Sequence, residues 1–236
     1  MTASRRGRKG SGSPTVMAIV AARNEEASIR LTVKALAEVP GVAEVVVVSD
    51  GSSDRTAEEA LGAGARVLSR PDRVGKGRAL DEALDRVPRA DVYLFVDGDV
   101  GETASEASKL LGPVTAGELD VAVARFPPLP GGGFGLVKAM SVWVVRTAGS
   151  LSLAEPLSGQ RAMTREALWA CRPLADGFGL ETALAIDAAR LGFRIGEIPV
   201  AMTHRPTGRG IAGFAHRGRQ GVDILRAAAP RVLRLR

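Results

Sequence analysis

Apolar and polar positions along the first hundred residues fall into blocks that predict strands and helices in turn. Continuous apolar runs rich in β-branched residues predict strands, because a strand buried on both faces lacks polar alternation. These runs cover 16–22, 45–48, 66–69 and 92–96. Between them apolar residues recur at helical spacing, as in 25–39, where Ile29, Val33 and Leu36 share one face. The order βαβαβαβ predicts a parallel sheet covered by helices on both faces.

The second half of the chain follows a less regular pattern, without an internal repeat. Apolar stretches at 121–125 and 194–200 predict two more strands. A stretch rich in proline and glycine at 127–135 predicts a loop. Helical spacing predicts helices at 136–148, 164–170, 181–190 and 211–228. Together the halves predict a single α/β domain with a Rossmann-like, mostly parallel sheet and helices on both faces.

Composition fits an ordinary globular core and restricts the chemistry. Of the 236 residues, 45% are hydrophobic and 25% are charged, as in typical globular domains. The single cysteine, Cys171, excludes an internal disulfide and a cysteine-based zinc cluster. Glycine and serine, rather than an apolar stretch, follow the basic start of the chain. We therefore expect neither a signal peptide nor a membrane span, and a cytoplasmic location.

The net charge of +6 comes mainly from the two ends of the chain. Residues 1–14 predict a disordered basic tail, and 206–236 predict a basic helical segment. The interior lacks the mixture of basic and aromatic residues that stacks bases, so we expect no nucleic-acid partner. The C-terminal arginines could receive a phosphate-bearing ligand or lie peripherally on the anionic inner face of a membrane. The oligomeric state is left open, with a homodimer as one option.

Polar and charged residues follow each of the four predicted strands of the first half. The successive strand ends carry the sequences ARNEE, SDGSSD, GKG and DGD. The carboxyl ends of parallel strands meet at one edge of the sheet, which is where ligands bind in such folds. We therefore expect these four segments to contribute to one site.

Asp97 and Asp99 are the sharpest candidates within these segments. Alternate residues of an extended chain project to the same side, and Gly98 permits a tight turn between them. Hard carboxylate oxygens suit Mg²⁺ or Mn²⁺, which also take diphosphate oxygens. An exposed acidic turn would give the same letters, but the position after a buried strand favours a metal site.

Two other residues of these segments, Lys76 and Asp50, are candidates for nucleotide binding. Lys76 lies just before a predicted helix, where it would help to attract phosphate; a solvated loop lysine is the alternative. Asp50 could hydrogen-bond a base or ribose, because residues 52–54 offer other caps for the following helix. Asn24 is a candidate N-cap for the first helix, and Glu25 could be a first-turn carboxylate that favours the helix dipole.

The succession ARNEE, VVVVSDGSSDRT, GKG and FVDGD resembles the family 2 glycosyltransferases with the GT-A fold, over roughly 15–100. It is most similar to the branch with polyprenyl-phosphate glycosyltransferases and glucosyl-3-phosphoglycerate synthases. The resemblance implies one GT-A domain at 15–205, with a nucleotide-binding half at 15–100 and an acceptor half at 101–205. It implies transfer of one sugar from a nucleoside-diphosphate sugar, with UDP favoured and GDP open, to an acceptor that could carry phosphate. A Q-x-x-R-W motif of processive synthases is absent.

The same resemblance implies roles for individual residues. The nucleotide would contact Ala22, Arg23, Glu25, Asp50, Lys76 and Asp97. A Mg²⁺ or Mn²⁺ ion would be held by Asp97, Asp99 and His204. The sugar or acceptor would contact Ser158, Gly159, Gln160, Arg161, Arg205 and Arg209. Glu181, in a GFGLE segment that looks like the GYGVE of the phosphoglycerate-type synthases, and Asp176 are the catalytic candidates. Either would deprotonate the acceptor in an inverting enzyme, and Glu181 would orient sugar or acceptor in a retaining one.

Two other classes of function stay open at the level of sequence. A sugar nucleotidyltransferase would share the sheet and the metal but would carry a glycine-rich phosphate loop after the first strand, where this chain has 21–25. It would release pyrophosphate rather than a nucleoside diphosphate. A non-enzymatic basic module that binds nucleic acid or membrane would explain the charge but not the four polar strand ends. Its binding would be sensitive to salt.

Overall fold

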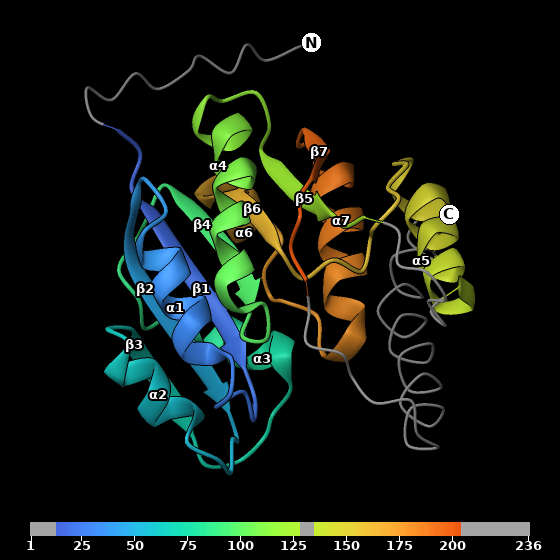
Figure 1. Cartoon of the computed structure of the whole chain (residues 1–236). Helices are drawn as coiled ribbons and strands as arrows, with labels where there is room; N and C mark the ends of the chain where they lie inside the picture. Colours follow the sequence, from blue (N-terminus) through green and yellow to red (C-terminus); the bar gives the residue numbers. More distant parts are fainter. Residues whose placement is uncertain (1–12, 128–134, 204–236) are drawn as a thin grey trace.

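A seven-stranded sheet between two layers of helices forms the centre of the computed structural model, which describes residues 13–127 and 135–203 (Figure 1). The strands lie in the order β3-β2-β1-β4-β6-β5-β7. Their bounds are β1 Val16–Ala22, β2 Val42–Asp50, β3 Arg66–Arg70, β4 Val92–Asp97, β5 Val121–Arg125, β6 Arg161–Thr164 and β7 Ile195–Pro199. The helices are α1 Ile29–Ala37, α2 Thr56–Gly62, α3 Lys76–Leu84, α4 Ser108–Thr115, α5 Gly135–Gly149, α6 Arg165–Ala170 and α7 Leu180–Arg190, with 3₁₀ turns η1 Gly101–Ala107 and η2 Gly177–Gly179.

The first four strands are parallel and end together. In the register of the sheet, Ala22 at the end of β1 lies opposite Ser49 of β2, and Ala21 lies opposite Asp97 at the end of β4. Asp50, the last residue of β2, lies opposite Arg70 of β3. The expected arrangement of four strand ends at one edge is therefore confirmed.

Two apolar layers cover the sheet. Side chains of α1, α2, η1 and α4 pack on one face with Ala18, Val20 and their neighbours. Side chains of α3, α6 and α7 pack on the opposite face with Met17, Ile19 and their neighbours. This alternation follows from the period of two along a strand. α5 lies outside this second layer and packs against α7 (Figure 1).

β6 was not expected from the sequence, and it changes the geometry of the site. It lies between β4 and β5 and is antiparallel to both, so the sheet is mostly rather than wholly parallel. Arg161, its first residue, lies opposite Phe95 near the carboxyl end of β4. The segment that enters β6 therefore arrives at the edge where β1 to β4 end.

The first helix begins later than the sequence pattern suggests. α1 starts at Ile29 with Ser28 in the N-cap position. Asn24 has a φ of 57°, and its side-chain oxygen accepts a hydrogen bond from Ser53 N at 2.9 Å. The prediction that Asn24 caps this helix is therefore wrong, because the residue is used to join two loops.

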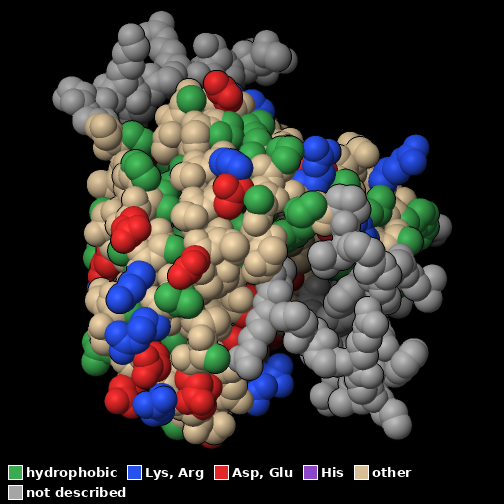
Figure 2. Space-filling view, viewed as in Figure 1, with side chains coloured by type: hydrophobic (Ala, Val, Ile, Leu, Met, Phe, Trp, Pro, Cys, Tyr) green, Lys and Arg blue, Asp and Glu red, His purple; other side chains and the backbone are tan. Residues whose placement is uncertain are grey.

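Several predicted segments lie outside the described residues: most of the tail at 1–14, most of the loop at 127–135, the helix at 211–228 and the segment 206–236. Within the described ranges, no helix has the length and hydrophobicity to cross a membrane. Figure 2 shows basic and acidic side chains interspersed over the face near α1 and α2. Ion pairs such as Arg30–Glu59 account for part of this mixture.

Candidate active site

The loops after β1 and β2 are joined by hydrogen bonds into one surface, which we call the strand-end platform (residues 23–26 and 52–56). Asn24 N donates to Ser52 Oγ at 3.2 Å, and Glu25 N donates to Thr56 Oγ1 at 2.8 Å. Desolvation acts to raise the pKa of Asp54, but hydrogen bonds from Thr56 lower it below its usual value. Neutral donors therefore make the hydrogen bonds of the platform, beside one longer ion pair between Arg55 Nε and Glu26 Oε2 at 3.7 Å.

Three candidates for the nucleotide site lie at the start of this platform. Ala22 is buried at the end of β1, whereas Arg23 is exposed. Glu25 is half-buried, and its carboxylate accepts a hydrogen bond from Ser28 Oγ at 3.2 Å. The three residues thus lie together at the carboxyl edge, and their contact with a nucleotide stays a prediction.

Asp50 has a structural partner that the sequence did not reveal. Its side chain is buried, with 6% exposure for the residue. Its two oxygens accept hydrogen bonds from Val74 N at 2.8 Å and Gly75 N at 2.9 Å. Asp50 therefore holds the loop that leads into α3, and its contact with a base or ribose stays a prediction.

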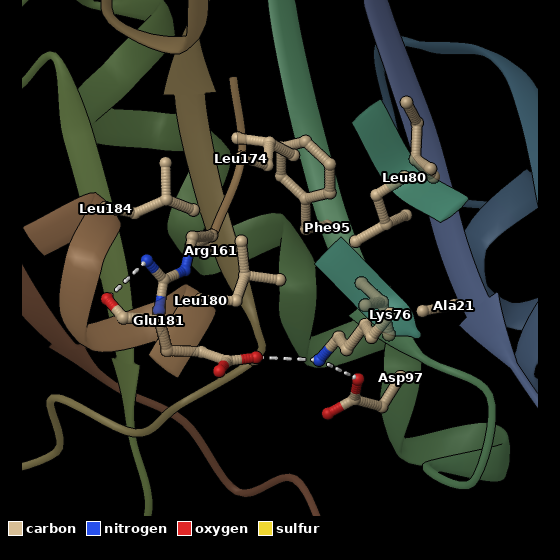
Figure 3. Close-up of a pocket in the computed structure, with 13 residues that line it drawn as sticks. Ala21, Lys76, Leu80, Phe95, Asp97, Arg161, Leu174, Leu180, Glu181 and Leu184 are labelled. Carbon is tan, nitrogen blue, oxygen red and sulfur yellow. Dashed lines mark hydrogen bonds and ion pairs between the residues drawn. The ribbon is translucent and has the colours of Figure 1, made fainter. Parts of the chain in front are cut away.

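A cluster of buried and half-buried charges lines a small pocket at the same edge; we call it the charged pocket (Lys76, Asp97, Arg161 and Glu181). Figure 3 shows the Lys76 ammonium between two carboxylates that come from different elements. Lys76 Nζ donates to Asp97 Oδ1 at 2.7 Å and to Glu181 Oε1 at 2.9 Å. The first residue of α3, the last of β4 and the second of α7 thus meet at one point.

The ammonium of Lys76 is held in its charged form by its two carboxylate partners. Burial acts to lower the pKa of Lys76, but the charges and hydrogen bonds of Asp97 and Glu181 raise it above its usual value. Burial likewise lowers the pKa of Arg161, and the charges of Glu181 and Asp97 oppose this. Arg161 is 2% exposed and donates to the backbone oxygens of Glu181, at 3.3 Å, and of Ser158. The pocket therefore presents fixed charges, which is what stabilisation of a leaving anion needs.

The segment before β6 completes the wall around Asp97. Gln160 is fully buried, and its Nε2 donates to Asp97 Oδ2 at 2.9 Å. A Cβ added to Gly159 would lie 2.5 Å from Asp97 Oδ2 and 2.8 Å from Lys76 Nζ. Ser158 is buried beside them. Four of the residues predicted to contact sugar or acceptor, Ser158, Gly159, Gln160 and Arg161, are therefore brought to the pocket.

Two of the three predicted metal ligands lie among the residues that the structure describes. Asp97 and Asp99 are both half-buried at the end of β4. Among the described residues, no three His, Cys, Asp or Glu side chains form a group that could hold a metal ion. The third predicted ligand, His204, lies outside the described residues, as do Arg205 and Arg209. Two carboxylates still fit Mg²⁺, which proteins usually bind through one or two carboxylates together with substrate phosphates.

The two catalytic candidates lie in different surroundings. Glu181 is 7% exposed and lines the pocket. Asp176 is exposed in the N-cap position of η2 and interacts electrostatically with Arg78. It is not among the described residues that line the pocket. The geometry therefore favours Glu181 as the residue that acts at the reacting atoms.

A clamp between α3 and the segment before η2 was missed at the level of sequence. Arg172 Nε donates to Asp81 Oδ1 at 2.8 Å, and Arg172 Nη1 donates to Asp85 Oδ1 at 2.7 Å. A Cβ on Gly77 would lie 1.9 Å from Ala175 O. The glycine in the GKG motif could have suggested close backbone contact, whereas nothing in the sequence pairs Arg172 with α3.

Comparison with known proteins gives matches to one family. The sequence model of glycosyl transferase family 2 matches residues 17–164. Glycosyltransferase AglJ of Haloferax volcanii is 34% identical over 172 residues, which cover 71% of this chain and 56% of that protein. Glucosyl-3-phosphoglycerate synthase of Mycobacterium tuberculosis is 34% identical over 204 residues, which cover 75% of this chain and 62% of that protein. The chain thus spans about three fifths of the length of these relatives.

Solved structures agree with these matches. The M. tuberculosis synthase in complex with Mn²⁺, UDP and glucosyl-3-phosphoglycerate superimposes with a TM-score of 0.77 at 29% identity, covering 92% of this chain and 80% of that one. Its complex with Mg²⁺ and UDP gives a TM-score of 0.77 at 30% identity, with the same coverage. The GT-A fold expected from the strand-end motifs is confirmed. By its matched sequence, its sheet and its strand ends, this chain belongs to glycosyl transferase family 2.

Proposed function

We propose that this chain is a metal-dependent glycosyltransferase that moves one sugar from a nucleoside-diphosphate sugar, with UDP favoured, to a phosphate-bearing acceptor. The observation that carries the proposal is the meeting of Lys76, Asp97 and Glu181 at the carboxyl edge of β1 to β4. Support comes from the M. tuberculosis relative, whose structures hold UDP with Mn²⁺ or Mg²⁺ and a phosphoglycerate ligand.

Asp97 and Asp99 would hold the Mg²⁺ or Mn²⁺ ion, with His204 as a third ligand from outside the described residues. When bound, such an ion supplies positive charge that offsets the charge of a leaving diphosphate. The donor set of this chain fits the ion, since it offers hard carboxylate oxygens at the edge where the strands end.

The protein's own groups would divide the remaining work. Lys76 would place its ammonium against the diphosphate, where a fixed cation stabilises the oxygen that departs from the sugar C1. Glu181 would accept the proton of the acceptor hydroxyl as the acceptor oxygen bonds to C1, if the configuration is inverted. In a retaining enzyme its carboxylate would orient the sugar or the acceptor. The platform, with Arg23, Glu25 and Ala22, would receive the nucleoside, and Asp50 would support it through the loop before α3.

The acceptor would enter beside Ser158, Gly159 and Gln160. Buried Arg161 would fix this wall of the pocket, and Arg205 and Arg209 would supply charge for an acceptor phosphate. Cytoplasmic location, peripheral contact with an anionic membrane, and a homodimer stay predictions.

The proposal is tested by calorimetric binding of UDP and GDP to the chain, with and without Mn²⁺, and to Asp99→Ala. We expect one nucleotide, UDP, to bind only with metal, and Asp99→Ala to abolish that binding. Absence of binding by either nucleotide under every metal condition would overturn the proposal. Release of pyrophosphate from a sugar phosphate and a nucleoside triphosphate would instead support a nucleotidyltransferase.

A further inference from the structure

Glu197 lies on β7, at the edge of the sheet far from β1, and none of the roles assigned so far uses it. Its carboxylate accepts hydrogen bonds from two consecutive backbone amides: Ala154 N lies 2.9 Å from Oε2, and Glu155 N lies 2.6 Å from Oε1. Hydrogen bonds to an ionised group are about twice as strong as neutral ones, and a pair of them also fixes direction. Glu197 therefore anchors the start of residues 154–160, which we call the site loop.

The same cross-strand row of the sheet anchors the other end of the site loop. Arg161 of β6 and Glu197 of β7 both pair with Val123 of the strand between them. Residues that pair across strands project to the same face. Arg161 Nη2 donates to the backbone oxygen of Ser158. A glutamate and an arginine of one row thus hold the two ends of the loop over one face of the sheet.

Beyond these anchors the site loop touches the charged pocket directly. Gly159 approaches Asp97 and Lys76 so closely that a Cβ would lie 2.5 Å from the carboxylate. Gln160 Nε2 donates to the same Asp97 oxygen at 2.9 Å. Close-packed interiors transmit small displacements. A shift of the site loop would therefore move the Asp97 carboxylate.

A second contact holds the site loop less firmly. The Glu155 side chain forms an ion pair with Lys138 of α5, and these side chains are 22% and 40% exposed. Ion pairs that remain within reach of solvent contribute little to stability. The backbone amides of the loop, by contrast, depend on Glu197.

We propose that Glu197 is a positioning residue for the metal and donor site, acting through the site loop on Asp97. This inference rests on the proposed function, since it assigns Asp97 to that site. Partners that hydrogen-bond a metal ligand typically contribute 10–100-fold to metal affinity. Glu197 acts on the start of the site loop rather than on Asp97 itself, so its loss should cost about tenfold, near the low end of that range.

The test compares Glu197→Gln with Glu155→Gln, which removes the ion pair to Lys138 but keeps both backbone hydrogen bonds. Glutamine matches the size of glutamate but puts an NH₂ group beside a backbone N–H. We expect Glu197→Gln to weaken Mn²⁺-dependent UDP binding, measured by calorimetry, and Mn²⁺ affinity in the presence of UDP, measured by electron paramagnetic resonance, by about tenfold. Glu155→Gln should stay within about twofold of the wild type.

A double-substitution cycle separates positioning from a general loss of stability. If Glu197 acts through the contact of the site loop with Asp97, Glu197→Gln should cost less than about threefold in a Gln160→Ala background, because coupled sites are not additive. Glu197→Asp, which keeps the charge but shortens the reach, replaces Glu197→Gln if the latter does not fold.

Wild-type affinity in Glu197→Gln, or effects of Glu197→Gln and Gln160→Ala that multiply independently, would overturn the inference. Failure of the wild-type chain to bind UDP or GDP under any metal condition would instead overturn the proposed function, and that result is visible before any variant is made.

Discussion

The strand-end platform and the charged pocket share one edge of the sheet, but different forces hold them. In the platform, hydrogen bonds from backbone amides reach side-chain oxygens such as Ser52 Oγ, Thr56 Oγ1 and the Asn24 amide oxygen. In the pocket, the ammonium of Lys76 faces the carboxylates of Asp97 and Glu181 directly.

The comparison shows that the strand-end motifs contain two kinds of residue: some fix the shape of the backbone, and others supply charge for chemistry. Residues of the platform have satisfied one another, so their side chains set the path of the backbone. Residues of the pocket carry full charges, two positive and two negative, at a place from which water is partly excluded, where charge acts more strongly. A polar strand-end motif alone therefore does not identify the reacting groups, because both kinds of residue belong to it.

The largest effect should come from removing the cation of the pocket. Lys76→Met leaves Asp97 and Glu181 without the ammonium between them and removes the charge expected to meet the diphosphate. We expect kcat/KM for sugar transfer to fall about 10²-fold or more. Lys109→Met, which removes a surface ion pair to Glu106, should stay within about twofold. Equal activity of the two variants would contradict the role of Lys76 in the charged pocket.

A methyl group at Gly159 should have an intermediate effect. The added Cβ would lie inside contact distance of both Asp97 and Lys76, so the ion pair must move. We expect Gly159→Ala to weaken Mn²⁺-dependent UDP binding about tenfold in calorimetry. Gly112→Ala is the matched control, because its Cβ meets nothing within 4 Å and it lies in α4. Unchanged nucleotide binding in Gly159→Ala would contradict the close contact in the pocket.

The smallest effect should come from the platform, and it should depend on pH. Asp54→Asn removes the charge from the hydrogen bonds to Thr56 and Glu26 N, which we expect to cost about 1 kcal/mol of unfolding free energy at neutral pH. The pKa of Asp54 is lowered on folding. Its stabilisation is therefore present above the unfolded pKa, near 3.9, and is lost as the pH falls through the lower folded value.

Urea unfolding of the wild type and Asp54→Asn at pH 7 and in acid measures this difference. The difference in unfolding free energy between the wild type and Asp54→Asn should become smaller in acid. The rate of sugar transfer by Asp54→Asn at neutral pH should change only a few-fold. A loss of activity as large as that of Lys76→Met would place chemistry in the platform and remove the contrast.

The first half of the fold followed from its pattern because β1, β4 and most of β2 are buried on both faces, whereas the edge strand β3 is only partly buried. The three buried strands contain nearly unbroken apolar runs, and such runs are visible without any knowledge of partners. β6 was missed for the opposite reason: its four residues begin with a buried arginine, whose burial depends on Glu181 and Asp97 far away in sequence. η1 and α4 were missed as well, in a stretch with many small residues and Pro113.

The sequence allowed the residues of the candidate site to be named, but it revealed few of the contacts between them. Lys76 and Asp97 were singled out by their positions at the strand ends, and Glu181 by the resemblance of its GFGLE segment to the GYGVE of the phosphoglycerate-type synthases. The structure brings the three within hydrogen-bonding distance. The hydrogen bonds from Val74 N and Gly75 N to the Asp50 carboxylate join the end of β2 to the loop before α3. No pattern of nearby residues in the sequence predicts them. The same is true of Glu197 and the loop before β6.

The contact between Gly77 and the backbone oxygen of Ala175, where a Cβ would lie 1.9 Å away, also has an evolutionary side. It presses the first turn of α3 against the segment that leads to Glu181, so the backbones that carry Lys76 and Glu181 are tied to each other. A lineage that lost this glycine would have to reshape both segments together. Single substitutions are therefore tolerated less at this seam than in the loops that border the pocket elsewhere.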